Sequence, residues 1–483
     1  MHSLNYLVLP VKTAALVLAI LLKLTFPGII YGENNVVQIS GKAPGYAGEE
    51  IVFYRWTDFI SFTEKEMVRF VVNENDEFSV EFIACRQPVY IFSNSGRYFL
   101  YMYVQGGKEY HVILPPMSER APHEKMNPYF EGIPTHIAVI NNDDTELNEL
   151  VRVFDELFDP LIGVSLVEQS VDQVSSFLDS VSLELARRFE GVDNAYFSNY
   201  VKYKTGLLES IGLIHSARYL SDNYFRHKPV LYDNVSYMEL FNQVYNRYFL
   251  FFSRTIKGSR IFEDINRRKS LSSLMNTLQT DTVLGSGRLL ELVVLKGIHD
   301  AFYGSDFSRS GLLNVLDSLA YRTDHPEHKQ VASFIRAKIT RQIPGFPAPG
   351  FSLKDREGNL KELSDYRGYY IYLNFCTAAS YSCLAEYDVL SRLYDKHREY
   401  LRIITVFIDN DYHSMLNFLS KNEYDWDFLF YGNQPSLLKE YDVRMFPGYY
   451  LIDRDGTNLM FPAPSPAEDF ERYLLRTMQS RGE

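Results

Sequence analysis

The fold is decided by residues 369–383, which read Tyr369-Tyr-Ile-Tyr-Leu-Asn-Phe-Cys-Thr-Ala-Ala-Ser-Tyr-Ser-Cys383. The aromatic and aliphatic run 369–375 is typical of a buried β-strand, and residues 383–396 are expected to form the helix that follows it. An α/β sheet places ligands where a strand ends and the next helix begins. Because a helix N-terminus also stabilises a thiolate, we expect the chemistry of this chain at Cys383.

Strand and helix patterns alternate outward from this segment. The Pro- and Gly-rich stretch 341–350 predicts a domain boundary before it. After it we expect strands at 401–408 and 448–452, a turn at 453–456 with a last strand behind it, and helices at 412–419, 436–441 and 466–481. This alternation predicts an α/β domain over 346–483, with a central sheet that carries helices on both faces.

The chain before this boundary shows two other patterns. Short β-branched and aromatic runs between turn residues fill residues 36–116 and predict a small antiparallel β-sandwich, which Pro115-Pro116 closes. Residues 120–341 carry apolar side chains at helical spacing and predict an all-α middle region. The expected helices lie around 147–158, 171–185, 196–210, 237–252, 288–301, 310–320 and 328–340.

The N-terminus has the pattern of a secretory signal. A weakly basic start with Lys12 precedes the apolar run 13–22, and small and turn-forming residues lead to Gly32. This run is short for a membrane span and lies where a signal peptide belongs, although a retained anchor is the alternative. We therefore expect residues 1–32 to direct export to the periplasm or cell envelope, with membrane contact only before cleavage. No cysteine near the cleavage region could carry a lipid anchor.

Charge and cysteine content exclude some functions. The net charge of -12 argues against nucleic acid as a partner, because phosphates are bound mainly by Lys and Arg. The three cysteines, Cys85, Cys376 and Cys383, are too few for a disulfide framework in a chain of 483 residues, and an odd count leaves at least one thiol without an intramolecular partner. Cys85 is expected in the core of the β-domain.

A pair of histidines stands in the helical region. His325 and His328 flank Pro326-Glu327, with no third ligand beside them in the sequence. Two histidines next to a proline are more often a polar helix start than a metal site. We therefore predict no metal here, and the sequence indicates no cofactor.

The C-terminal part resembles the periplasmic TlpA/ResA-like branch of the thioredoxin superfamily, as found in Bacteroidetes envelope proteins. The resemblance rests on Ala348-Pro-Gly-Phe-Ser-Leu353, Asp355, Gly358, Leu363-Ser-Asp-Tyr-Arg-Gly368, Asn374-Phe375, Glu386 and Val443-Arg-Met-Phe-Pro447, the last followed by Tyr449-Tyr-Leu-Ile-Asp453 and Gly456. It implies a thioredoxin fold, a cis peptide at Phe446–Pro447 and descent from thiol–disulfide oxidoreductases. The implied partners are extended polypeptides or protein thiols and disulfides.

The motif itself departs from the family pattern. Alignment on Asn374-Phe375 and Glu386 puts Ser380 where the family has its attacking cysteine and Cys383 where it has the resolving one. A serine hydroxyl stays protonated near neutral pH and cannot replace a thiolate in attack on a disulfide. The sequence alone therefore excludes ordinary disulfide reduction by a C-x-x-C pair.

Three alternative hypotheses follow from this departure. In the first, the domain is a binding module that uses the groove beside Phe446 and Pro447, where the family pairs substrate chain with its own backbone. In the second, it is a thiol enzyme that uses Cys376 and Cys383, provided that their Cα atoms lie within roughly 7 Å. In the third, it is a peroxidase built on the spacing from Ser380 to Cys383.

Simpler roles are weighed beside these hypotheses. Cys376 and Cys383 can both be small buried apolar residues, as free cysteines often are. Ser380 can serve as the N-terminal cap of the helix. The peroxidase hypothesis also lacks a matching cation, since Arg444 lies close to the expected position but is not a match.

Overall fold

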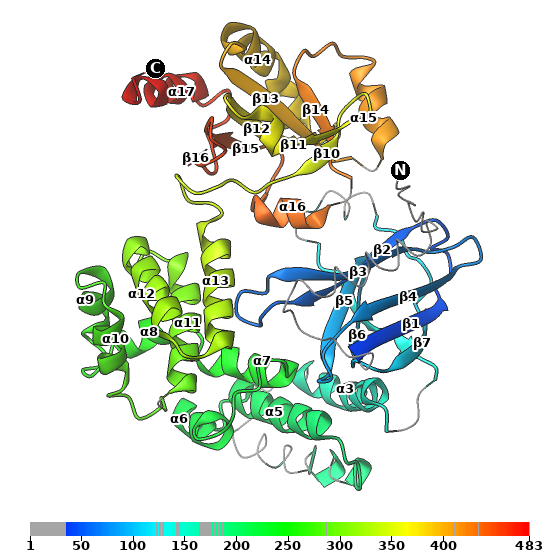
Figure 1. Ribbon diagram of the computed structural model, residues 1–483, viewed down its shortest axis with the longest axis vertical. Coiled ribbons are helices and arrows are strands. Elements are labelled where there is room, and N and C mark those ends of the chain that lie inside the picture. Colours follow the sequence, from blue (N-terminus) through cyan, green and yellow to red (C-terminus); the bar gives the residue numbers. More distant parts are fainter. Residues whose placement is uncertain are drawn as a thin grey trace, which may run out of the picture.

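The structure is a computed structural model and describes residues 35–482, apart from 122–123, 125–126, 128–129, 142–144, 164–175, 177–179, 182, 186, 286, 410 and 433. Figure 1 shows a β-domain, a helical region and a C-terminal α/β domain. The expected signal peptide, residues 1–32, lies outside the described residues. Among the helices that are described, none is long and apolar enough to cross a membrane.

Two sheets form the β-domain. Their strand orders are β4-β1-β7-β9 and β3-β2-β5-β6-β8. The strands are β1 (Val36–Lys42), β2 (Glu50–Trp56), β3 (Glu64–Val71), β4 (Glu77–Ile83), β5 (Val89–Ser95), β6 (Tyr98–Val104), β7 (Glu109–Ile113), β8 (Ile133–His136) and β9 (Ala138–Val139). Alternate side chains of both sheets, among them Val37, Ile39, Phe53, Ile91 and Met102, meet in one buried apolar cluster. The two sheets therefore form the predicted sandwich.

Three details of this domain correct the prediction. Strands β8 and β9 belong to the two sheets, so the domain continues beyond Pro116 to Val139. These strands are too short for a period-2 pattern to stand out. The pairs β1–β7 and β6–β8 are parallel, whereas the other pairs are antiparallel. Cys85 is exposed rather than buried, because it follows the end of β4, where its Sγ donates to the Gln87 carbonyl at 3.4 Å.

The middle region is helical, as predicted. Its helices are α3 (Leu147–Gly163), α5 (Ala195–Ile211), α6 (Ala217–Leu220), η3 (Ser221–Phe225), α7 (Val235–Val244), α8 (Tyr248–Ser253), α9 (Ile261–Asn266), α10 (Leu271–Leu278), α11 (Arg288–Phe302), α12 (Arg309–Arg322) and α13 (Pro326–Thr340). The expected helix 237–252 is wrong as one element, because Arg247 adopts a left-handed conformation with φ 48° and separates α7 from α8. Most of the expected helix 171–185 lies outside the described residues.

The C-terminal domain has one mixed sheet, with the order β11-β10-β14-β13-β12-β15-β16. Its elements are β10 (Ser352–Lys354), β11 (Leu360–Glu362), η4 (Leu363–Tyr366), β12 (Tyr370–Cys376), α14 (Tyr381–His397), β13 (Leu401–Phe407), α15 (Tyr412–Leu419), β14 (Asp427–Phe430), α16 (Pro435–Glu440), β15 (Gly448–Ile452), β16 (Asn458–Met460) and α17 (Phe470–Ser480). The prediction missed only the short strand β14 among the central strands. The thioredoxin-like fold that the resemblance implied is confirmed.

Both faces of this sheet are covered. Along β12, Tyr370, Tyr372 and Cys376 pack with α14, α15 and α17 on one face, and Ile371 and Leu373 pack with α16 and η4 on the other. All seven residues of β12 are buried, as expected for a central strand. This alternation directs the Cys376 side chain toward α14.

Candidate active site

The candidate site lies where β12 meets α14. Four residues after Cys376 turn the chain, and Ser380 caps the helix with φ -93° and ψ 112°. The Ser380 Oγ accepts a hydrogen bond from the Cys383 peptide N–H at 3.4 Å. Such a cap satisfies an N–H group that the first helical turn leaves without a partner. The cap fixes Cys383 in the first turn of α14.

Cys376 and Cys383 lie together in this corner. Both side chains have no exposed surface, and both belong to the apolar cluster between the sheet and α14. The Cys376 thiol hydrogen-bonds to the Cys383 sulfur. Both residues are free thiols in the structure. The sequence did not decide whether these two cysteines can act as a pair, and the fold brings them together.

The two thiols differ in acidity. Burial raises the pKa of Cys376 well above its ordinary value. The hydrogen bond from Cys376 lowers the pKa of Cys383 against the effect of burial, and the Ser380 hydroxyl and the Thr377 peptide N–H lower this pKa further. A hydrogen-bond donor favours the charged form of its acceptor. Cys383 is therefore the more acidic of the two thiols, and Cys376 is the less acidic.

Glu386 lies half-buried on α14, one turn after Cys383. Its carboxylate accepts a hydrogen bond from the Tyr449 hydroxyl of β15. The negative charge of Glu386 adds to the burial that raises the pKa of Cys376, and it partly opposes the hydrogen bonds that lower the pKa of Cys383. The structure therefore brings Glu386 to the thiols and ties it to the neighbouring strand.

The loop before β15 borders the same corner. The Phe446–Pro447 peptide is cis, as the resemblance implied. The next residue, Gly448, pairs with Phe375, so this loop lies beside the end of β12. Phe446 is half-buried and packs against the cluster that contains both cysteines. The structure thus brings Phe446 and Pro447 to the same corner as the thiols.

Apolar side chains are exposed at the two segments that form the corner. Tyr381, the first residue of α14, is 84% exposed, and Leu384 on the next turn is 39% exposed. Met445, next to Phe446, is 71% exposed. Apolar side chains that gather at one place on a surface often mark a binding site.

Arg444, the cation weighed for a peroxide site, forms an ion pair on its own loop. Its Nε and NH2 groups lie 3.0 and 2.8 Å from the Asp442 carboxylate, and its side chain is 75% exposed. The guanidinium is thus engaged by a carboxylate of its own loop. The peroxidase hypothesis therefore gains no support from Arg444.

Sequence reasoning missed two residues of this site. One is Tyr387, whose hydroxyl lowers the pKa of Cys376, although burial raises this pKa by more. Nothing in the sequence marked Tyr387. Asp409 binds the loop after Cys376, and its Oδ1 accepts from the Thr377 hydroxyl at 3.1 Å. Its place after the predicted strand 401–408 could have revealed it, because carboxyl ends of neighbouring parallel strands meet at one edge.

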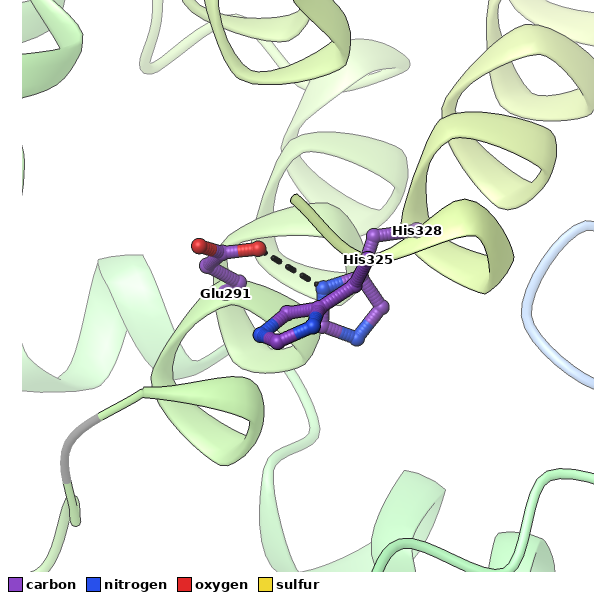
Figure 2. A group of neighbouring side chains, drawn as sticks. All are labelled: Glu291, His325 and His328. Carbon is purple, nitrogen blue, oxygen red and sulfur yellow. Dashed lines mark hydrogen bonds and ion pairs between the residues drawn. The ribbon is translucent and has the colours of Figure 1, made fainter. Parts of the chain in front are cut away.

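A second group of ionisable side chains lies in the helical region. Glu291, His325 and His328 each offer a ligand atom within 4.8 Å of the others. Figure 2 shows the Glu291 carboxylate pointing at His328, with the His325 ring beside them. The argument that no third ligand lies near the two histidines is therefore wrong, because α11 supplies Glu291 from a distant part of the sequence.

Hydrogen bonds already engage this group. The Glu291 Oε2 accepts from Thr323 Oγ1 at 2.5 Å and lies 2.8 Å from the His328 Nδ1. Arg288 Nε donates to the His325 Nδ1 at 3.2 Å. A cation would have to displace these bonds and would meet the positive charge of Arg288. The absence of a metal stays a prediction.

Comparison with known proteins finds relatives of the C-terminal part. The model of the AhpC/TSA family matches residues 344–457. Over 135 residues the chain is 31% identical to the thiol-disulfide oxidoreductase ResA of Bacillus thuringiensis subsp. konkukian. The match covers 27% of this chain and 77% of that protein. Over 132 residues it is 29% identical to ResA of Geobacillus kaustophilus, covering 27% of this chain and 75% of that protein.

Solved structures also match this part of the chain. The thioredoxin domain of a thiol-disulfide oxidoreductase from Bacteroides vulgatus is 20% identical with a TM-score of 0.26, and the match covers 28% of this chain and 97% of that domain. A thiol:disulfide interchange protein from Bacteroides sp. is 20% identical with a TM-score of 0.26, covering 28% of this chain and 89% of that protein.

Proposed function

Because this chain belongs to the TlpA/ResA-like thioredoxin-fold family, we propose that it is an exported cell-envelope protein that carries out thiol–disulfide exchange with Cys376 and Cys383. The observation that carries the proposal is the hydrogen bond between these two thiols inside one buried cluster. Ser380 stands in place of the attacking cysteine, so the reactive sulfur is Cys383.

The exchange runs in two steps. The Cys383 thiolate attacks a disulfide of the partner, forms a mixed disulfide and releases one partner thiolate. The Cys376 thiol then gives its proton to the partner thiolate released in the first step and attacks the Cys383 sulfur of the mixed disulfide. This attack breaks the bond between Cys383 and the partner and releases the second partner thiolate. The partner disulfide is reduced to two thiols, and Cys376 and Cys383 are oxidised to one disulfide.

Access limits this chemistry to particular substrates. Neither sulfur has exposed surface, so the loop after Cys376 has to shift before a partner sulfur reaches Cys383. An extended chain bound along the segment at Phe446 and Pro447 would hold a disulfide next to this loop. The proposed natural substrates are therefore disulfides in extended protein segments, whereas a small disulfide supplied in excess can enter whenever the loop opens.

Oxidised glutathione tests the exchange. After incubation and unfolding, alkylation and mass spectrometry should find that Cys376 and Cys383 have lost their free thiols and form one linked pair of peptides. In Cys376→Ala, Cys383 should retain a glutathione adduct, because the resolving thiol is gone. Cys85→Ser serves as the control and should behave like the wild type. Two fully alkylated cysteines in the treated wild type would refute the exchange.

A binding function is the second candidate. It is favoured by the burial of both sulfurs together with the exposure of Tyr381 and Met445. In this case Cys383→Ala should bind an unfolded polypeptide as the wild type does, whereas Phe446→Ala should lose the binding. Loss of binding in Cys383→Ala alone would instead support a covalent, thiol-dependent contact.

Export by residues 1–32 is part of the proposal. Its support is the short apolar run 13–22 that follows Lys12. Intact-mass analysis of the protein from envelope fractions should give an N-terminus near residue 33. A mass that includes the apolar run would show that this segment is retained.

A further inference from the structure

Asp409 follows β13 and binds the segment that joins the two cysteines. Its Oδ1 accepts from the Thr377 hydroxyl at 3.1 Å, and its Oδ2 accepts from the Ala378 peptide N–H at 3.1 Å. The two bonds use both carboxylate oxygens and engage two consecutive residues. A carboxylate that accepts in this way fixes the position and orientation of the peptide it holds.

The bound segment is short and internally bonded. The Ala379 N–H donates to the Thr377 Oγ1 at 3.3 Å, and the Ser380 N–H donates to the Thr377 carbonyl at 3.1 Å. Ser380 in turn caps α14 through the Cys383 N–H. Asp409 therefore acts at the base of a continuous chain of bonds that ends at Cys383.

The strands do not need Asp409 to stay together. Cys376 pairs with Phe407 in the parallel register of β12 and β13, and the Ile408 N–H donates to the Cys376 carbonyl at 2.7 Å. The backbone ladder thus ends at Cys376. Asp409 adds bonds beyond the ladder, where the chain leaves the sheet and turns toward α14.

We propose that Asp409 is a positioning residue, whose carboxylate holds the 377–380 loop so that the Thr377 peptide N–H faces the Cys383 sulfur. Asp409 touches neither sulfur and acts only through Thr377 and Ala378. The bond that the Thr377 N–H makes is one of those that lower the pKa of Cys383. The inference rests on the proposed function for its purpose, but its test needs only the reduced protein.

The test is the pH dependence of Cys383 alkylation in Asp409→Asn. Asparagine can keep both contacts, because its Oδ1 can accept from the Ala378 N–H and its Nδ2 can donate to the Thr377 hydroxyl, but it replaces two charge-assisted hydrogen bonds by weaker neutral ones. The rate of iodoacetamide labelling, followed on the Cys383 peptide by mass spectrometry, should have its midpoint shifted up by roughly half to one pH unit. The midpoint reports acidity, whereas the plateau rate reports access.

Asp411→Asn is the matched control. Asp411 caps α15 by accepting from the Ser414 N–H at 2.8 Å. Its substitution by asparagine makes the same chemical change two residues away from Asp409. Asp411→Asn should keep thermal stability close to that of the wild type, because asparagine caps helices about as well as aspartate, and it should not move the Cys383 midpoint. An unchanged midpoint in folded Asp409→Asn, or an equal shift in both variants, would overturn the inference.

A milder variant covers the case in which Asp409→Asn does not fold. Thr377→Val removes the hydroxyl that Asp409 binds and leaves the Thr377 peptide N–H in place, so a smaller upward shift of the midpoint is expected. No shift in this variant would count against the inference. Failure of the Cys376–Cys383 pair to form a disulfide would refute the proposed exchange but would not change this titration.

Discussion

At the scale of single residues, the site depends on which side chain stands at position 380. Ser380 is half-buried and caps α14, whereas Cys383 three residues later has no exposed surface. The position from which a partner disulfide could be attacked thus carries a hydroxyl, and the sulfur is withdrawn behind it. For the proposed exchange, this arrangement favours slow, selective reaction over general reductase activity.

Ser380→Cys should restore general reductase activity. The new thiol would lie partly exposed at a helix N-terminus, three residues before Cys383, where a thiolate is stabilised. Reduction of insulin with dithiothreitol as the electron source should accelerate by roughly tenfold or more over the wild type.

Ser380→Ala is the control for this gain. It removes the cap and should cost about 1 kcal/mol of stability without any gain in insulin reduction. A folded Ser380→Cys protein with a titratable thiol at 380 and no gain would contradict the assigned role of this position.

At the scale of elements, the starts of α11 and α13 are joined by buried polar groups. His328 is fully buried, its Nδ1 faces Glu291 at 2.8 Å and its Nε2 lies 2.8 Å from the Tyr232 hydroxyl. Burial lowers the pKa of His328 from its ordinary value of 6.5, although the bond to Glu291 raises it in part. The folded protein therefore holds His328 neutral where the unfolded chain would charge it.

This predicts acid sensitivity of the helical region. Below pH 6.5 the unfolded chain binds a proton at residue 328 that the folded protein does not bind, so stability falls as the pH falls toward the lowered folded pKa. Urea unfolding between pH 7.5 and 5.5 should show this as a loss of up to about 1.4 kcal/mol per pH unit. His328→Gln should have a flatter dependence, and equal slopes in both proteins would refute the assignment.

At the scale of the whole molecule, the turn between β2 and β3 connects the β-domain to the helical region. Figure 1 shows this hairpin reaching toward α13. Ile60 is 2% exposed and belongs to the core of the helical region. The Phe59 carbonyl accepts from Asn242 at 2.7 Å, and the Ser61 carbonyl accepts from Lys338 of α13. The two parts thus share both apolar and polar contacts.

Ile60→Ala should destabilise the helical region by about 2–4 kcal/mol, because it leaves a cavity in a core that the β-domain helps to fill. Chemical denaturation followed by circular dichroism measures the loss. Val71→Ala, also in the β2–β3 hairpin but 60% exposed, should change stability by less than about 0.5 kcal/mol. Equal effects of the two substitutions would show that the contact does not couple the two parts.

The sequence by itself determined the C-terminal architecture. The nearly continuous apolar run in 369–375 and the helical pattern after Cys383 are local properties of the chain, and the structure repeats them as β12 and α14. The serine at position 380 is likewise read directly from the sequence, and it suffices to exclude a C-x-x-C pair.

Only the tertiary structure decided which groups meet. The contact between Cys376 and Cys383 depends on how the loop folds back over the end of β12, and Asp409 reaches that loop from another strand. Glu291 joins His328 from a different helix, and Cys85 is exposed because of where β4 ends. Periodicity describes neighbours along the chain, whereas these distances are set by packing between segments far apart in sequence.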